Sequence, residues 1–169
     1  YGPATWPNNN GILGSKEHPV MGICYYEAEA FFRWLQQTYE PEDGWQWCLP
    51  TEDMWEFAAR TADGRHYPWG DYFEKGRCNS IEEGIGRATS VKNFPNGKTS
   101  NDCYDMVGNV WEFVSSDDSE SWACVLRGGS YKNNKDEIRC MLRLYRVPRY
   151  HRPPDFGFRG AQKIIKKQL

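Results

Sequence analysis

The chain has no apolar run of the roughly 18 residues that a membrane-spanning helix requires, so we expect no membrane insertion. It also has no excess of one charge, because 21 Lys and Arg stand against 23 Asp and Glu for a formal net charge of -2. Basic residues cluster only in the tail after residue 162, which argues against a nucleic-acid partner. The first residues do not resemble a secretion signal. We therefore expect a cytoplasmic protein, with the cell surface as the alternative.

The six cysteines lack the spacing of a zinc site. They stand at positions 24, 48, 78, 103, 124 and 140, with no Cys-x-x-Cys pair and no closely spaced histidine. Two interpretations remain open: three disulfides in an oxidising compartment, or small buried thiols in a domain that is large enough to have a core. We favour free thiols.

Turn-forming residues are spread from end to end, with 16 glycines and 10 prolines, so long regular elements are few. Only residues 26–40 and 51–61 have a helical pattern. The first segment carries an apolar stripe of Ala28, Phe31, Phe32, Leu35 and Tyr39. The second begins with Thr51 as its N-cap and buries Trp55, Ala58 and Ala59. Short strands are expected at 124–127 and 156–159. The predicted fold class is α+β, one domain with two helices, short strands and much irregular structure.

Six motifs occur in order: PVMG at 19–22, LPTE with WEFAAR at 49–60, YPWG at 67–70, DMVGNVWE at 105–112, LRGGSY at 126–131 and GFR at 157–159. They resemble the formylglycine-generating-enzyme (sulfatase-modifying factor) family, which implies a C-type lectin-like fold. The family's amino-terminal strands have no counterpart here. We therefore divide the chain into a lead-in at 1–18 left from a longer domain, the family domain at 19–162 and a basic tail at 163–169. The tryptophans of the motifs are expected to anchor the core.

The segment 105–112 is a candidate calcium site. Asp105 and Glu112 offer carboxylates, and Gly108 and Val110 offer carbonyl oxygens on a sharp turn. Calcium accepts six to eight oxygen ligands in irregular geometry, and the absence of His or Cys disfavours zinc. The resemblance also implies a structural Ca2+ at this motif, and a second one that would use Asn79. The alternative is that Glu112 accepts hydrogen bonds from backbone amides without a metal.

The oxidase chemistry of the family requires two cysteines shortly after the LRGGSY motif, but residues 132–138 contain none. Cys140 matches a structural cysteine of the family, and one thiol cannot form the two-sulfur site that copper(I) requires. We therefore predict a non-catalytic ligand-binding domain. The alternative is a formylglycine-generating oxidase or a related metal-dependent, oxygen-using enzyme that modifies a cysteine-containing substrate.

The segment after LRGGSY also resembles the variable proteins of diversity-generating retroelements, which display hypervariable side chains between a Gly-Gly-Ser-aromatic motif and Gly-Phe-Arg. That resemblance implies a bacterial or phage protein. Tyrosine and arginine recur in binding hot spots, which favours a protein or peptide ligand over a sugar. An ordinary non-catalytic family member is the other interpretation. The predicted ligand-binding residues are Tyr131, Asn133, Leu144, Tyr145, Arg149, Tyr150 and His151.

Overall fold

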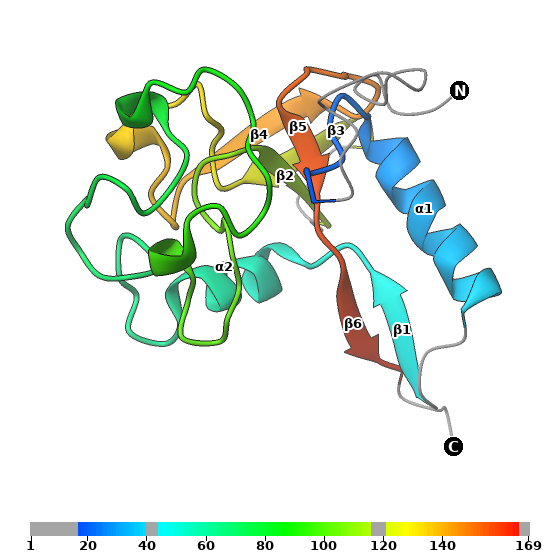
Figure 1. The fold of residues 1–169 in the computed structure, drawn as a ribbon. Helices are drawn as coiled ribbons and strands as arrows, with labels where there is room; N and C mark the ends of the chain where they lie inside the picture. The colour runs from blue at the N-terminus through cyan, green and yellow to red at the C-terminus, as the bar shows by residue number, and fades with distance from the viewer. Residues whose placement is uncertain (1–16, 40–43, 116–120, 166–169) are drawn as a thin grey trace.

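The computed structural model describes residues 17–39, 44–115 and 121–165. Most of the predicted lead-in and the end of the basic tail lie outside these residues. A four-stranded sheet with the order β4-β3-β2-β5 forms the centre, and a separate antiparallel ribbon pairs β1 with β6 (Figure 1). The strands are β1 Trp45–Cys48, β2 Trp111–Val114, β3 Ala123–Arg127, β4 Arg143–Pro148, β5 Phe156–Phe158 and β6 Ala161–Ile164. Strand β5 runs parallel to β2, and the other pairs are antiparallel.

The two predicted helices are present as α1, Tyr25–Thr38, and α2, Glu52–Arg60. At the start of α1 the Glu27 carboxylate accepts a hydrogen bond from the backbone N–H of Cys24 at 2.8 Å. At the start of α2 the Thr51 hydroxyl oxygen accepts one from the Met54 N–H at 3.2 Å. These caps satisfy amides that the first helical turn leaves without a partner. Neither helix is long and apolar enough to cross a membrane in the part of the chain that is described.

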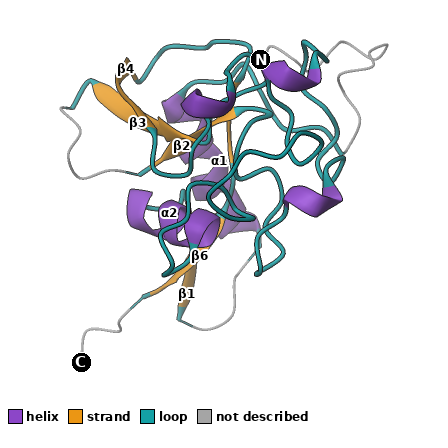
Figure 2. Ribbon diagram, turned by 90° about the vertical axis from the view of Figure 1, so that its left-hand side faces the viewer, coloured by secondary structure: helices purple, strands orange, loops and turns teal. Residues whose placement is uncertain are grey.

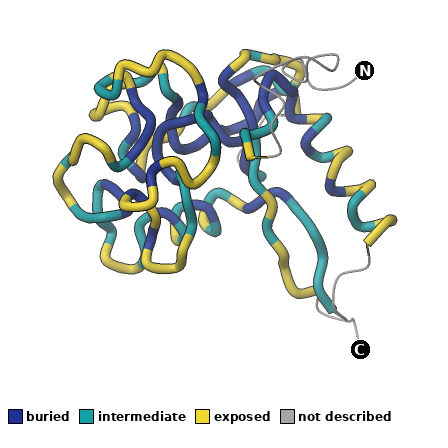
Figure 3. Tube along the Cα trace, viewed as in Figure 1, coloured by how far each residue is buried: buried dark blue, intermediate teal, exposed yellow. Residues whose placement is uncertain are grey.

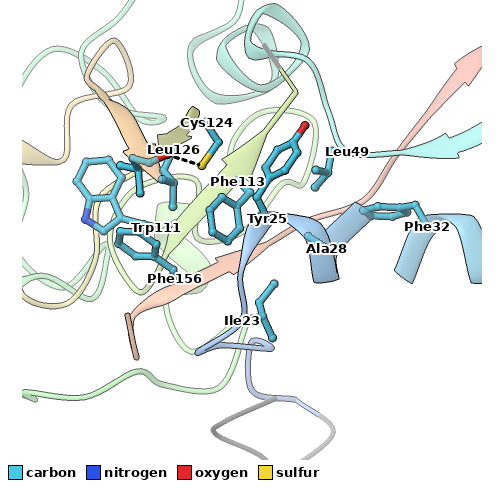
Figure 4. Close-up of a cluster of buried hydrophobic side chains, with 11 residues drawn as sticks. Ile23, Tyr25, Ala28, Phe32, Leu49, Trp111, Phe113, Cys124, Leu126 and Phe156 are labelled. Atoms are coloured by element: carbon cyan, nitrogen blue, oxygen red, sulfur yellow. Dashed lines mark hydrogen bonds between the residues drawn. The ribbon is translucent and has the colours of Figure 1, made fainter. Parts of the chain in front are cut away.

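The core has two main clusters. One lies between α1 and the sheet and includes Phe32, Phe113 and Phe156 (Figure 4). The other surrounds Trp55 of α2, which is 1% exposed. The predicted stripe of α1 is wrong at two positions, because Phe31 and Tyr39 are exposed while Ala28 and Phe32 are buried. Figure 3 shows buried and exposed positions following one another along α1. The buried face of α1 is therefore narrower than the predicted apolar stripe.

Loops make up most of the chain between α2 and β2 (Figure 2). Three short 3-10 helices, Ile81–Glu83, Pro95–Gly97 and Lys135–Glu137, interrupt the loops of the chain. The buried side-chain amides of Asn79 and Asn109 link these loops. The Asn79 Nδ2 donates to Asn109 Oδ1 at 3.1 Å, and the same oxygen accepts from the Thr89 N–H at 2.9 Å. A Cβ on Gly108 would meet the Asn79 carbonyl oxygen at 2.4 Å, so only glycine fits there. The α+β class and the lectin-like architecture are therefore as predicted, and all six cysteines are free thiols.

Candidate ligand-binding surface

Strand β4 is an edge strand of the central sheet, and it carries a β-bulge. Leu144 lies opposite Leu126 and Val147 lies opposite Cys124, so Tyr145 and Arg146 together face the single residue Val125. Arg146 has a φ of 58° in the left-handed region. Non-glycine residues rarely adopt such backbone angles, and bulges redirect side chains at sheet edges and near binding sites. The bulge therefore distorts β4 at Tyr145 and Arg146, and both residues are exposed to solvent.

Large side chains are exposed around this edge. Tyr145 is 63% exposed and Tyr150, in the turn that follows β4, is 72% exposed. Trp122, which directly precedes β3, is 47% exposed. The Arg149 N–H donates to the Trp122 carbonyl at 2.9 Å, which holds the turn after β4 against the start of β3. Trp122 was absent from the predicted set because a lone tryptophan before a strand has no sequence pattern that separates surface from core.

Two predicted members of the surface instead support it from below. Leu144 packs against the core cluster under α1. The Arg149 side chain donates from Nε to the Ala123 carbonyl at 2.7 Å, and its guanidinium lies 4.8 Å from the Tyr25 ring centre. The Tyr25 N–H also donates to the Arg149 carbonyl at 3.0 Å. Arg149 therefore fixes the turn to α1 and β3, and His151, although exposed, has its ring near that of Phe156.

Tyr131 and Asn133 also have structural contacts. Tyr131 is half-buried against Met21 and the small cluster around it. The Asn133 Oδ1 accepts hydrogen bonds from the N–H and the hydroxyl of Ser130, each at 3.0 Å. The predicted residues therefore fall into two groups. Of its seven members, Tyr145, Tyr150 and His151 are exposed, and the other four are partly buried in contacts that build the fold.

Cys140, the cysteine that follows the position expected for the oxidase pair, is packed in the core. Cys140 is fully buried, its Sγ lies 3.8 Å from the Ala59 carbonyl oxygen, and burial raises the pKa of its thiol to about 12. The Cys140 carbonyl accepts from the buried guanidinium of Arg127 at 2.9 Å. A thiol with such a pKa remains protonated near neutral pH and is a poor nucleophile and metal ligand.

Glu112 does not fit the predicted role of calcium ligand. Its side chain is buried, and its Oε2 accepts from the Trp55 indole at 2.7 Å and from Arg159 Nε at 2.5 Å. Its Oε1 accepts from Arg159 Nη2 at 2.7 Å. Both oxygens are thus occupied by a bidentate arginine and an indole, which is a strong charge-assisted arrangement. The donors to Glu112 are side chains, where the alternative interpretation expected backbone amides.

Asp105 differs from Glu112 because its carboxylate receives weaker hydrogen bonds from side chains. Burial raises the pKa of its carboxyl to about 6, Arg159 opposes this shift, and the charge of Glu112 adds to it. Asn109 Nδ2 is its nearest side-chain donor, at 3.5 Å. Nearby in the same loop network, the buried Asn79 Oδ1 has no hydrogen-bond donor. Among the described residues no group of three His, Cys, Asp or Glu could hold a metal, so any calcium would rely on Asp105 and amide or carbonyl oxygens.

The fold and the motif loops define a lectin-like scaffold of formylglycine-generating type. The chain belongs to the family described as the sulfatase-modifying factor enzyme 1-like domain, whose sequence profile matches residues 2–164. It is 34% identical over 142 residues to the inactive C-alpha-formylglycine-generating enzyme 2 of Bos taurus, covering 75% of this chain and 43% of that protein. It is 33% identical over 151 residues to the formylglycine-generating enzyme of Streptomyces coelicolor, covering 71% and 44%. The chain thus spans less than half the length of either relative.

Two solved structures share the fold at low sequence identity. Variable protein 1 of Treponema denticola superposes with a TM-score of 0.78 at 18% identity, over 95% of this chain and 77% of the other. PvdO of Pseudomonas aeruginosa superposes with a TM-score of 0.75 at 19% identity, over 89% and 64%. This chain therefore shares its fold with two proteins that have different names.

Proposed function

We propose that this domain is a non-catalytic ligand-binding domain, which binds a protein or peptide through the edge of β4 and the turn after it. The bulged edge carries the proposal, because Tyr145 in the bulge and Tyr150 in the turn after β4 are more than half exposed, and Trp122 is exposed at the start of the adjacent strand β3. We call these three residues the aromatic edge. Aromatic side chains offer large contact area and lose little conformational entropy on binding, and they dominate interface hot spots.

The contacts beneath the aromatic edge support a display role. Arg149 ties the turn to Tyr25 and Ala123, and Leu144 anchors the strand in the core. Because these anchors alternate with the exposed residues, the exposed side chains can change without disturbing the packing beneath them. The similarity in fold to a variable protein supports the same reading of this segment. A reverse-transcriptase gene beside a near-copy of the coding region for residues 131–156 would place the chain among the variable proteins.

The second candidate is the oxidase expected from the family resemblance, which would act on a cysteine-containing substrate; the Streptomyces coelicolor relative is named a formylglycine-generating enzyme. The family membership favours it, and the buried Cys140 thiol and the lack of cysteine at 131–139 oppose it. The two candidates are separated by incubating the chain with copper and a cysteine-containing sulfatase peptide. Our proposal requires that no aldehyde forms above the rate of a copper-only blank.

Binding can be tested with a displayed library of random peptides selected on the wild-type chain. Selected peptides are then measured on Tyr145→Ala, on Tyr150→Ala and on the control Tyr72→Ala, whose side chain is exposed in a distant loop. We expect at least one of the first two changes to weaken binding about 30-fold, as loss of a hot-spot residue does, and the control to bind as wild type. Peptides that bind all three variants equally well would contradict the proposal.

A further inference from the structure

A cavity of about 430 Å³ lies between α1 and the β1–β6 ribbon, apart from the aromatic edge. Helix α1 supplies one wall through Tyr25, Glu29 and Phe32, and the ribbon supplies another through Trp47 and Lys163. The volume falls within the range of roughly 300–1,000 Å³ that small-molecule sites occupy. Figure 4 shows that Tyr25 and Phe32 come from α1 about two turns apart, and that Leu49 lies near Tyr25.

The cavity combines an apolar floor with polar side chains that have no partner in the described part of the chain. Phe32 and Leu49 belong to the core cluster and give the floor its apolar character. Above it, the side chains of Gln46, Ser115 and Lys163 have no hydrogen bond or ion pair with any described residue. A few polar groups that converge on an apolar hollow are the usual composition of a ligand site, since they orient a ligand whose body the floor desolvates.

The charges in the cavity favour an anion. Glu29 is already engaged, because its carboxylate lies 3.5 Å from the Arg33 guanidinium, and burial together with its charge raises the pKa of the nearby Tyr25 hydroxyl. Lys163 has no carboxylate partner among the described residues, and the described lining carries one negative and two positive side chains, a net charge of +1. Burial raises the pKa of the Cys48 thiol, and Lys163 acts in the opposite direction, which shows that the lysine charge reaches the cavity wall. A ligand with one negative group would therefore complement it.

We propose that this cavity binds a small organic carboxylate with an aromatic or similarly flat apolar body. The carboxylate lies toward Lys163 and takes hydrogen bonds from Ser115 and Gln46. The apolar body lies against Phe32 and Leu49. This site is independent of the aromatic edge, so it stands whether or not that surface binds a peptide.

The test uses the whole chain and phenylacetate as probe, followed through the indole N–H resonances of its eight tryptophans in 1H–15N spectra. The Trp47 resonance, assigned with Trp47→Phe, should shift and saturate with a dissociation constant of about 1 mM or below, as expected for a ligand of this size. Lys163→Gln should weaken binding about 2- to 5-fold, the range for one exposed ion pair, and neutral phenylacetamide should bind wild type correspondingly more weakly. Lys75→Gln, on a distant exposed loop, should bind phenylacetate as wild type does.

Three results would overturn the proposal: no shift of the Trp47 resonance at 10-fold the expected constant (about 10 mM), equal binding of acid and amide, or unchanged affinity in Lys163→Gln. If Trp47→Phe fails to fold, the assignment is made from the backbone of the wild-type chain. The Lys163→Gln comparison does not depend on that variant, because Lys163 is an exposed residue whose loss should leave the fold intact.

Discussion

The segments around Glu112 and Tyr145 each contain residues that suggest a binding site from the sequence, yet the fold places these residues in opposite ways. At 105–112 the conspicuous carboxylate turns inward to Arg159 and the Trp55 indole. At 143–151 the conspicuous tyrosines turn outward from an edge strand. The difference shows that residue type alone did not identify a site here. Charged Glu112 is part of the core, and aromatic Tyr145 is part of the surface.

The largest effect should come from removing the buried partner of Arg159. Glu112→Ala leaves that guanidinium without its carboxylate and the Trp55 indole without its acceptor, so we expect a loss of about 3–5 kcal/mol in the free energy of unfolding. Urea denaturation measures it. Glu74→Ala is the matched control, since it removes an exposed pair with Arg77 and should cost less than about 1 kcal/mol. Equal losses of stability in both variants would contradict the claim that Glu112 is part of the core.

Calcium should have the next largest effect if Asp105 takes part in a site. At a concentration of 100 times its dissociation constant, calcium would add about 2.7 kcal/mol, which raises the melting temperature by several degrees in a domain of this size. Calorimetry with Ca2+, with Mg2+ and with chelator measures the shift. We expect Asp105→Asn to remove it. Identical melting curves in Ca2+ and in chelator would end the calcium prediction.

Without calcium, the charge of Asp105 should be a cost to the fold. Its folded pKa of about 6 lies above the ordinary 3.8, so the folded state binds the proton more tightly and stability falls as pH rises through the window between these values. Asp105→Asn should therefore stabilise the chelated protein by about 2–3 kcal/mol above pH 6 and by little near pH 4. Denaturation at both pH values tests this. Asp102→Asn, at an exposed neighbouring position, should show no such pH-dependent gain.

The smallest effect on stability is expected at the aromatic edge. Tyr145→Ala and Tyr150→Ala should each change the free energy of unfolding by less than about 0.5 kcal/mol, because exposed side chains contribute little. Val147→Ala, at a buried position in the same strand, is the contrasting control and should cost more, about 1–3 kcal/mol. If the tyrosine variants were unfolded, Tyr145 and Tyr150 would be core residues and the proposed binding surface would be wrong.

The sequence predicted the elements whose signals are local. The apolar spacing and the Thr51 cap placed both helices to within two residues at each end, and strand β3 was expected from its apolar run. It could not predict the partners of Glu112, because Trp55 lies 57 and Arg159 47 residues away and only the folded chain brings them together. The partial burial of four predicted ligand-binding residues could not be predicted for the same reason. Tyr131 and Arg149 look like interface residues until their contacts with distant segments are known.

The bulge in β4 also bears on how the chain avoids associating with itself. An unpaired sheet edge exposes a row of N–H and C=O groups that can recruit another strand, and aromatic side chains would normally increase that risk. In β4 the ladder is interrupted at Tyr145 and Arg146, and Pro148 at its end has no N–H to donate. The edge is therefore a poor template for a second strand. The exposed Tyr145 therefore lies on an edge that resists strand-to-strand aggregation.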